Sequence, residues 1–99
     1  PHDTAIDGAP SSGLMTDTID IPANGWLVAG VNYNGTSGQS FTWTGAANER
    51  FDGAYADAAG VYRTDADESA LAAQTGRTIS ALFSNTGAAN GALAAMSWG

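Results

Sequence analysis

The stretch LMTDTIDIPANGWLVAGVNY, residues 14–33, decides the fold class. In its first eight residues, every second position shares one face of the chain, namely Met15, Asp17, Ile19 and Ile21. This period of two predicts a half-buried β-strand. Residues 22–25 predict a turn, because Asn-Gly is a strong hairpin signal. The nearly continuous apolar run at residues 26–33 predicts a central strand.

Five further stretches show short apolar alternation, at residues 41–44, 51–55, 61–63, 77–83 and 92–98. Turn signals rich in Gly and Asn separate them at intervals of roughly 8–12 residues, which is typical of a β-sandwich or barrel. We therefore predict an all-β fold, an antiparallel β-sandwich of jelly-roll or Ig-like type with seven or eight short strands. Trp43 and Phe51 are expected in its core. Residues 68–74 predict one helical turn capped by Asp67.

The first thirteen residues differ from the rest because they are polar and rich in Pro, Gly, Ser and Asp. Such a composition does not build a core. We predict an N-terminal arm over residues 1–13 and a single β-sandwich domain over residues 14–99. The arm is expected to dock on a neighbouring molecule, with Pro1, His2, Asp3, Thr4 and Ile6 as candidate contacts.

The charge balance of the chain is strongly acidic. Among 99 residues there are ten acidic side chains and three arginines, which gives a net charge of −7. Phosphate binding needs a cationic surface, so this balance argues against nucleic acid and against anionic lipid as partners. The chain has no cysteine, which excludes a disulfide framework and a thiolate metal site.

The sequence also carries expectations about where the protein is made. No run is long and apolar enough to span a membrane, and no signal peptide is visible. We expect removal of an initiator Met before Pro1 and synthesis in the cytoplasm, with a trimmed or processed chain as the alternative.

Two sets of residues are candidates for catalysis. His2 is the one histidine and lies in the predicted arm, away from any organised strand. Glu49 and Asp52 form the best placed carboxylate pair, but their spacing on a regular strand puts them on opposite faces. We therefore expect a protein that acts by contact, without catalysis and without a cofactor.

Asp65, Asp67 and Glu68 lie close together in a predicted acidic loop. Calcium binds loops of this kind through carboxylate oxygens. The order of ligands in an EF-hand is not met, so a solvated acidic loop is favoured and calcium binding is left open.

Aromatic residues are numerous for a short chain and suggest carbohydrate binding as an alternative. Phe41, Trp43, Phe51 and Phe83 alternate regularly and are predicted to be buried, whereas Tyr33 and Tyr62 are the better surface candidates. An exposed aromatic ring could stack on a sugar. Alanines crowd the last strand, where they predict either a thin core or a close approach by another subunit.

Four segments together resemble a known group of modules. Residues 41–52 read FTWTGAANERFD, and GVYRT, RTISALFS and ALAAMSW follow in that order. This order resembles small β-sandwich modules of phage virion proteins and bacterial surface proteins, over roughly residues 26–99. The resemblance implies that Glu49 and Arg50 form a corner that ties a loop to a strand. The motifs are structural, so they indicate a fold more than a function.

Within that group, a free-standing chain of this length looks most like a phage head decoration (cement) protein. The resemblance implies a multicopy, homo-oligomeric virion protein that clamps major capsid protein or other virion subunits. A carbohydrate-binding or tail-fibre module is the alternative.

Overall fold

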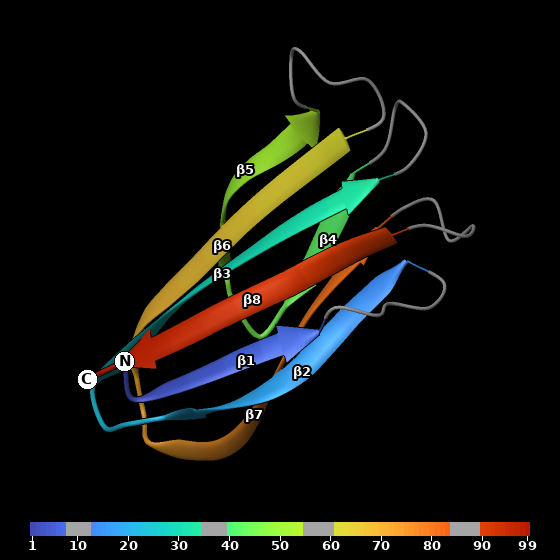
Figure 1. Cartoon of the computed structure of the whole chain (residues 1–99). Coiled ribbons are helices and arrows are strands. Elements are labelled where there is room, and N and C mark those ends of the chain that lie inside the picture. The colour runs from blue at the N-terminus through green and yellow to red at the C-terminus, as the bar shows by residue number, and fades with distance from the viewer. Residues whose placement is uncertain (8–12, 35–39, 55–60, 84–89) are drawn as a thin grey trace.

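The computed structural model describes residues 1–7, 13–34, 40–54, 61–83 and 90–99. Within these residues the regular structure is all β, with eight strands in two antiparallel sheets and no helix (Figure 1). The strands are β1 (Asp3–Asp7), β2 (Leu14–Ile21), β3 (Gly25–Asn34), β4 (Phe41–Thr44), β5 (Asn48–Ala54), β6 (Val61–Leu71), β7 (Gln74–Phe83) and β8 (Asn90–Trp98). The all-β prediction and the predicted number of strands are confirmed.

The two sheets are built mostly from strands that are distant in sequence. One sheet has the strand order β1-β8-β3-β6-β5 and the other has the order β2-β7-β4. Among the eight described strands, β5 and β6 are the one consecutive pair that lies side by side. Every other step along the chain therefore crosses from one sheet to the other. The predicted central strand β3 lies between β8 and β6, as its apolar sequence indicated.

The turn predicted at residues 22–25 is present. Asn24 has a φ of 55°, and the Gly25 N–H donates to the Pro22 carbonyl at 2.9 Å. The turn does not form a hairpin, however, because β2 belongs to the three-stranded sheet and β3 to the five-stranded sheet. The hairpin expected from Asn-Gly is therefore wrong, although the position of the turn is right.

The helical turn predicted for residues 68–74 is also wrong. Strand β6 continues to Leu71, and β7 begins at Gln74. Ala70, at a φ of 56°, and Gly76, at a φ of 68°, lie within these strands where the register shifts, of β6 against β3 and of β7 against β2. The polar composition of the segment fits an exposed strand end as well as a helix start, so the sequence could not separate the two.

Gly45 forms the corner between β4 and β5. Its φ is +85°, and a Cβ atom there would lie 2.1 Å from the Thr78 carbonyl oxygen. Only glycine fits, because any side chain would meet the backbone of β7 and would also strain the left-handed conformation.

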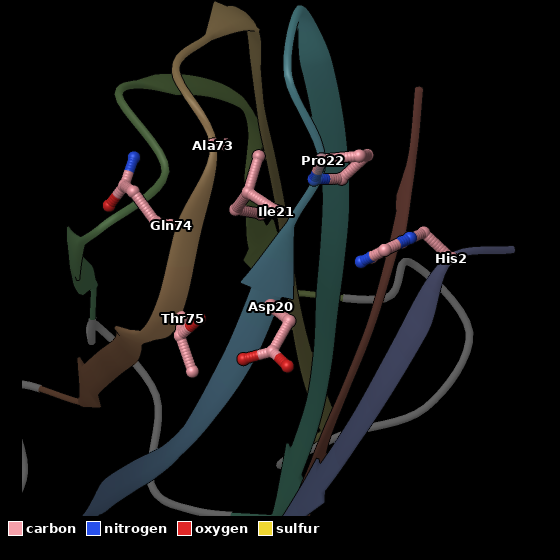
Figure 2. A pocket seen from close by; sticks show the side chains of 7 residues that line it. All are labelled: His2, Asp20, Ile21, Pro22, Ala73, Gln74 and Thr75. Carbon is pink, nitrogen blue, oxygen red and sulfur yellow. The ribbon is translucent and has the colours of Figure 1, made fainter.

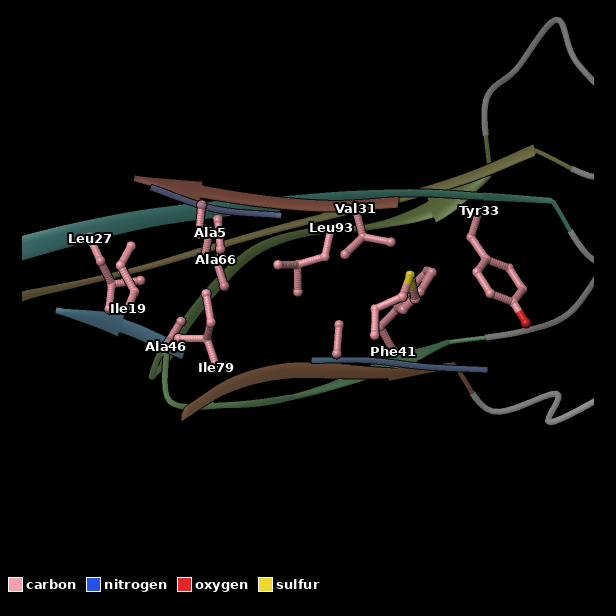
Figure 3. Packing of buried hydrophobic residues seen from close by; sticks show 14 of the residues in the cluster. Ala5, Ile19, Leu27, Val31, Tyr33, Phe41, Ala46, Ala66, Ile79 and Leu93 are labelled. Atoms are coloured by element: carbon pink, nitrogen blue, oxygen red, sulfur yellow. The ribbon is translucent and has the colours of Figure 1, made fainter. Parts of the chain in front are cut away.

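The core lies between the sheets (Figure 3). Leu27, Val31 and Leu93 of the five-stranded sheet face Ile19 and Ile79 of the three-stranded sheet, all of them buried. Burying a side chain of this size contributes about 1.5–3 kcal/mol. One end of the core is aromatic, formed by Tyr33, Phe41, Tyr62 and Phe83.

A row of four alanines crosses the inner face of the five-stranded sheet. Ala5 pairs with Ala95, Ala95 with Ala29, and Ala29 with Ala66. All four are buried. Of the alanines in the last strand, only Ala95 belongs to this inner row, whereas Ala92 and Ala94 are exposed on the outer side.

Two buried hydroxyl groups join the sheets. Thr64 Oγ1 accepts a hydrogen bond from Trp43 Nε1 at 2.8 Å and donates to the Phe51 carbonyl at 2.8 Å. Ser97 Oγ donates to the Asp20 carbonyl at 2.7 Å. Because both hydroxyls have partners, their burial carries no large desolvation cost.

The predicted N-terminal arm is wrong for residues Asp3–Asp7, which form β1. This strand pairs with β8, in a register that runs from Asp3 opposite Ser97 to Asp7 opposite Leu93. Ala5 is buried and fills the end of the alanine row. The domain therefore begins before residue 14, and residues 8–12 of the predicted arm lie outside the described residues. Composition missed this strand because its pairing relies on backbone groups, which every residue supplies.

A β-bulge in β5 overturns two predictions. The register of β5 against β6 shifts between Glu49 and Phe51. As a result Phe51 faces outward and is 39% exposed, so its assignment to the core is wrong, whereas Trp43 packs against the core as predicted. The extra residue also puts Glu49 and Asp52 on the same side of the strand, although regular alternation would separate them.

Candidate contact surface

The outer side of the five-stranded sheet carries a group of exposed apolar residues. We call this side the contact face and its apolar part the apolar half. The apolar half comprises Ile6, Trp26, Val28, Ala94, Met96 and Trp98. Of these, Ile6 is 71% exposed, Met96 44%, Trp26 43% and Val28 40%. Isolated exposed apolar residues are ordinary, but a contiguous group marks an interaction surface.

The strand register brings these residues together. Met96 on β8 lies opposite both Thr4 on β1 and Val28 on β3. Ala94 lies opposite both Ile6 and Gly30. The apolar half therefore spans three adjacent strands that all belong to a hydrogen-bonded sheet, and such a surface is fixed in position before any partner arrives.

Two tryptophans close one end of the apolar half. Trp26 and Trp98 are cross-strand partners, and their rings stack with centroids 4.6 Å apart and planes 21° apart. Stacked aromatic rings hold each other in one orientation. The pair therefore presents a rigid apolar edge.

The rest of the contact face is charged, and we call it the ionic half. Arg50 binds Asp67 through two hydrogen bonds, at 2.6 and 2.9 Å. Arg63 lies 3.3 Å from Asp65 and also stacks over the Phe51 ring at 4.5 Å. The Arg50 guanidinium lowers the pKa of the Asp67 carboxyl. In the part of this half that the structure describes, the charges of these two arginines and two aspartates cancel.

The outer side of the three-stranded sheet differs clearly from the contact face. Its exposed positions are mostly hydroxyl-bearing, namely Thr16, Thr18, Thr42, Thr44 and Thr78. Leu14 and Leu82 stand at one end, 41% and 42% exposed. Threonine is common on solvated strand faces because it favours β structure and binds water. This side therefore has the composition of a solvated strand face, and Leu82 provides a matched control for the contact face.

The predicted arm residues divide between several positions. Thr4 and Ile6 lie on the contact face, as the outward residues of β1. The His2 N–H donates to the Ser97 carbonyl at 2.6 Å, which extends the β1–β8 pairing, and Pro1 is exposed. Asp3 does not face outward but turns toward β2.

Aspartate side chains make hydrogen bonds between β1 and β2, which are edge strands of different sheets. Asp3 Oδ2 accepts from the Asp20 N–H at 2.7 Å, and Asp7 Oδ2 accepts from the Thr16 N–H at 2.9 Å. In the other direction, Asp17 Oδ2 accepts from the Ile6 N–H at 3.1 Å. These carboxylates take the place of ladder hydrogen bonds and cover two edges that would otherwise invite pairing with other chains. The backbone N–H groups of Asp20 and Thr4 lower the pKa of Asp3.

Tyr33 and Tyr62 do not lie on the surface, so their prediction as contact residues is wrong. They are 2% and 4% exposed and pack against Phe83 in the aromatic end of the core. Burial raises the pKa of the Tyr33 hydroxyl, which has no hydrogen-bond partner among the described residues. The glycan-binding alternative therefore loses the two residues on which it rested.

The predicted acidic loop is also wrong, because Asp65, Asp67 and Glu68 belong to strand β6. Each of the three carboxylates is paired with a different arginine, and the third pair joins Glu68 to Arg77 of β7. Within the described residues, no group of three or more ligating side chains could hold a metal ion. The three acidic residues therefore form ion pairs with the three arginines of the chain.

Glu49 and Asp52 converge on the inner side of β5 as a result of the bulge. Partial desolvation raises the pKa of Glu49, and the neighbouring Asp52 carboxylate raises it further. Asp52 Oδ2 also accepts from the Phe41 N–H at 3.0 Å, which ties β5 to β4. Asp52 thus links the two sheets, and Glu49 lies beside it.

A hollow of about 320 Å³ lies beside the chain termini (Figure 2). It is lined by His2, Asp20, Ile21, Pro22, Ala73, Gln74 and Thr75. Asp20 Oδ1 already accepts from the Gly76 N–H at 2.7 Å. The lining contains an imidazole, a carboxylate and the Thr75 hydroxyl, but the Asp20 carboxylate is held by the backbone of β7, so it does not orient an imidazole as in a catalytic triad.

Comparisons with known proteins add no relative. No family model, curated protein or solved structure matches the chain. In the part of the chain that the structure describes, no helix is long and apolar enough to span a membrane.

Proposed function

We propose that the protein is a virion structural subunit that decorates a phage head and stabilises the shell through surface contacts, without catalysis. Its partners are the major capsid protein or other virion subunits, and its location is the capsid surface after synthesis in the host cytoplasm. The observation that carries the proposal is the contact face, where four large apolar side chains stand exposed side by side on rigid strands.

The contact face suits a protein partner better than a small molecule. It is a sheet surface with exposed Ala92 and Ala94 and with Gly30 between bulkier neighbours. Flat apolar surfaces bordered by polar residues are typical of protein interfaces. Of the residues predicted from the sequence as contacts, Thr4 and Ile6 lie on this face. Trp26, Val28 and Met96 were not predicted, although the apolar run at residues 26–33 was the signal for the first two.

We also infer that the sandwich is a jelly roll. Its adjacent strands pair first with last, β1 with β8, β2 with β7, and β3 with β6. A long hairpin wrapped around a barrel-like core produces this order, and β5 departs from it because it pairs with β6 in the five-stranded sheet instead of with β4. Jelly rolls occur in viral capsid proteins and in lectins, so the topology supports the proposal by analogy of fold alone.

The experiment is to purify particles from cells that make the protein and to look for it by mass spectrometry and by immunogold labelling. We expect mass spectrometry to find many copies of the protein per particle, and immunogold labels to lie over the head. Labels confined to the tail would favour the tail-fibre alternative, and absence from purified particles would reject a virion role.

A binding assay tests the face directly. Met96→Glu places a charge in the apolar half, and Leu82→Glu places the same charge on the other sheet at nearly the same exposure, 42% against 44%. Cosedimentation with particles depleted of the protein should be lost for Met96→Glu and kept for Leu82→Glu. Equal binding by both variants would remove the contact face from the proposal.

A further inference from the structure

We infer that the occupant of the contact face is a second copy of this chain, packed face to face about a twofold axis. The inference rests on the proposed function only in taking the contact face as an interface between proteins. It takes the neighbour on this face to be another copy of the decoration subunit, so that the protein binds particles as a dimer and Met96→Glu lowers particle binding because it breaks that dimer.

The charge distribution favours this occupant. The chain carries a net charge of −7, so two copies repel each other over most of their surfaces. On the contact face, two of the three arginines cancel two aspartates. The carboxylates of Asp3, Asp7 and Asp17 turn aside to bind backbone N–H groups between β1 and β2. Two acidic copies can therefore approach through this face without the repulsion that acts elsewhere.

A twofold axis can match each half of the contact face with its own kind. Ile6, Ala94 and Gly30 form one cross-strand row over β1, β8 and β3, and Asp65 and Phe51 continue this row over β6 and β5. A twofold axis that runs along this row places the apolar half of each copy on the apolar half of the other, and the ionic half on the ionic half. In such an isologous contact the same patch serves both partners.

The area of the face is sufficient for a reversible dimer. The five strands are 5 to 11 residues long; at about 3.3 Å per residue and about 4.8 Å between strands, they cover roughly 650 Å² per copy. The pair would bury about 1,300 Å², which is at the lower end for specific interfaces. We therefore expect dissociation in the micromolar range rather than a permanent dimer.

Sedimentation velocity of the full chain over a wide range of concentrations tests the inference. The wild-type chain and Leu82→Glu should show a monomer–dimer equilibrium, and Met96→Glu and Val28→Glu should weaken association at least tenfold. Each substituted residue is exposed, so circular dichroism should show an unchanged fold. A wild-type chain that stays monomeric at the highest concentration, or equal loss of association in Leu82→Glu, would overturn the inference.

A cysteine probe gives a second readout that does not depend on weakening the contact. The chain has no cysteine, so Ala94→Cys introduces a single thiol on the contact face and Thr44→Cys a single exposed thiol on the other sheet. Oxidation of dilute protein should convert Ala94→Cys to a covalent dimer and leave Thr44→Cys largely monomeric. Equal crosslinking of the two variants contradicts a face-to-face dimer.

The two proposals fail in different ways. A monomeric wild-type chain that binds particles through Met96 keeps the proposed function and removes the second copy as occupant. A dimer that depends on Met96 and Val28 but never accompanies particles keeps the dimer and removes the virion role.

Discussion

Replacement of Thr64 by valine should destabilise the fold without leaving a cavity. Thr64 is fully buried on β6, and its hydroxyl accepts from Trp43 Nε1 and donates to the Phe51 carbonyl, both at 2.8 Å. Valine has nearly the same shape, so the packing is kept while an N–H and a carbonyl lose their partner. A buried polar group without a partner costs about 1–3 kcal/mol. Because Trp43 is only partly buried, its N–H regains some contact with water, and we expect a total loss of about 1–3 kcal/mol.

That loss is large for a chain of this size. Small domains have a free energy of unfolding of about 5–15 kcal/mol. At about 4–8 °C per kcal/mol, the melting temperature should fall by roughly 4–24 °C. Urea denaturation followed by tryptophan fluorescence measures the loss, with the m-value unchanged because the exposed surface on unfolding stays the same.

Two controls separate the hydrogen bonds from packing. Thr64→Ser keeps the hydroxyl, so it should lower the free energy of unfolding less than Thr64→Val does, although it removes a methyl group. A double-mutant cycle with Trp43→Phe should show a coupling of about 1 kcal/mol, since the two residues share one hydrogen bond. The reasoning is refuted if Thr64→Val lies within about 0.5 kcal/mol of the wild type, or if the cycle shows no coupling.

Three further predictions follow from particular side chains. The Arg50 guanidinium holds the pKa of Asp67 below its ordinary value of 3.8, so the pair stabilises the fold above that value and the stabilisation is lost as the pH falls through the lowered pKa. Asp67→Asn should therefore flatten the acid side of a plot of urea midpoint against pH below about 4, and an unchanged acid side contradicts this. Gly45→Ala should lower the free energy of unfolding by more than about 2 kcal/mol or prevent folding, because its Cβ would clash with the backbone of β7. Gly76→Ala should lower it by only about 1 kcal/mol, because a Cβ there meets no atom within 4 Å, and calorimetry compares the two variants. Tyr33→Phe removes a buried hydroxyl that has no partner among the described residues, so the free energy of unfolding should rise by up to about 1 kcal/mol. A clear fall in thermal unfolding experiments would show that the hydroxyl has a hydrogen-bond partner.

Several structural features were open to prediction from local pattern. Alternation placed Ile19, Ile79 and Phe83 in the core, because a strand with one buried face must repeat every two residues. The apolar run at residues 26–33 predicted the central strand β3, and the same run contained Trp26 and Val28 of the contact face. An antiparallel strand that is apolar on both sides must be covered twice or must expose one side, and this signal went unused.

Other features depended on partners that local pattern does not reveal. The bulge in β5 turned Phe51 outward and brought Glu49 toward Asp52, because one extra residue reverses the side on which every later side chain lies. Tyr33 and Tyr62 entered the core because they meet Phe83 of the opposite sheet. The strand at Asp3–Asp7 could not be read from composition, since its attachment relies on backbone pairing and on carboxylates of β2 as well as its own.

The sequence by itself determined which residues alternate, where the chain turns, and that a small acidic chain without cysteine must be held together by packing. The tertiary structure decided which strands pair, which sheet each strand joins, and therefore which apolar side chains are buried and which remain exposed together. The physical reason is that alternation is a property of neighbouring residues, whereas pairing between β1 and β8 or between β2 and β7 joins segments far apart in the chain. Such contacts depend on the closure of long loops and on the fit between two sheet faces, and the sequence of a single segment predicts neither.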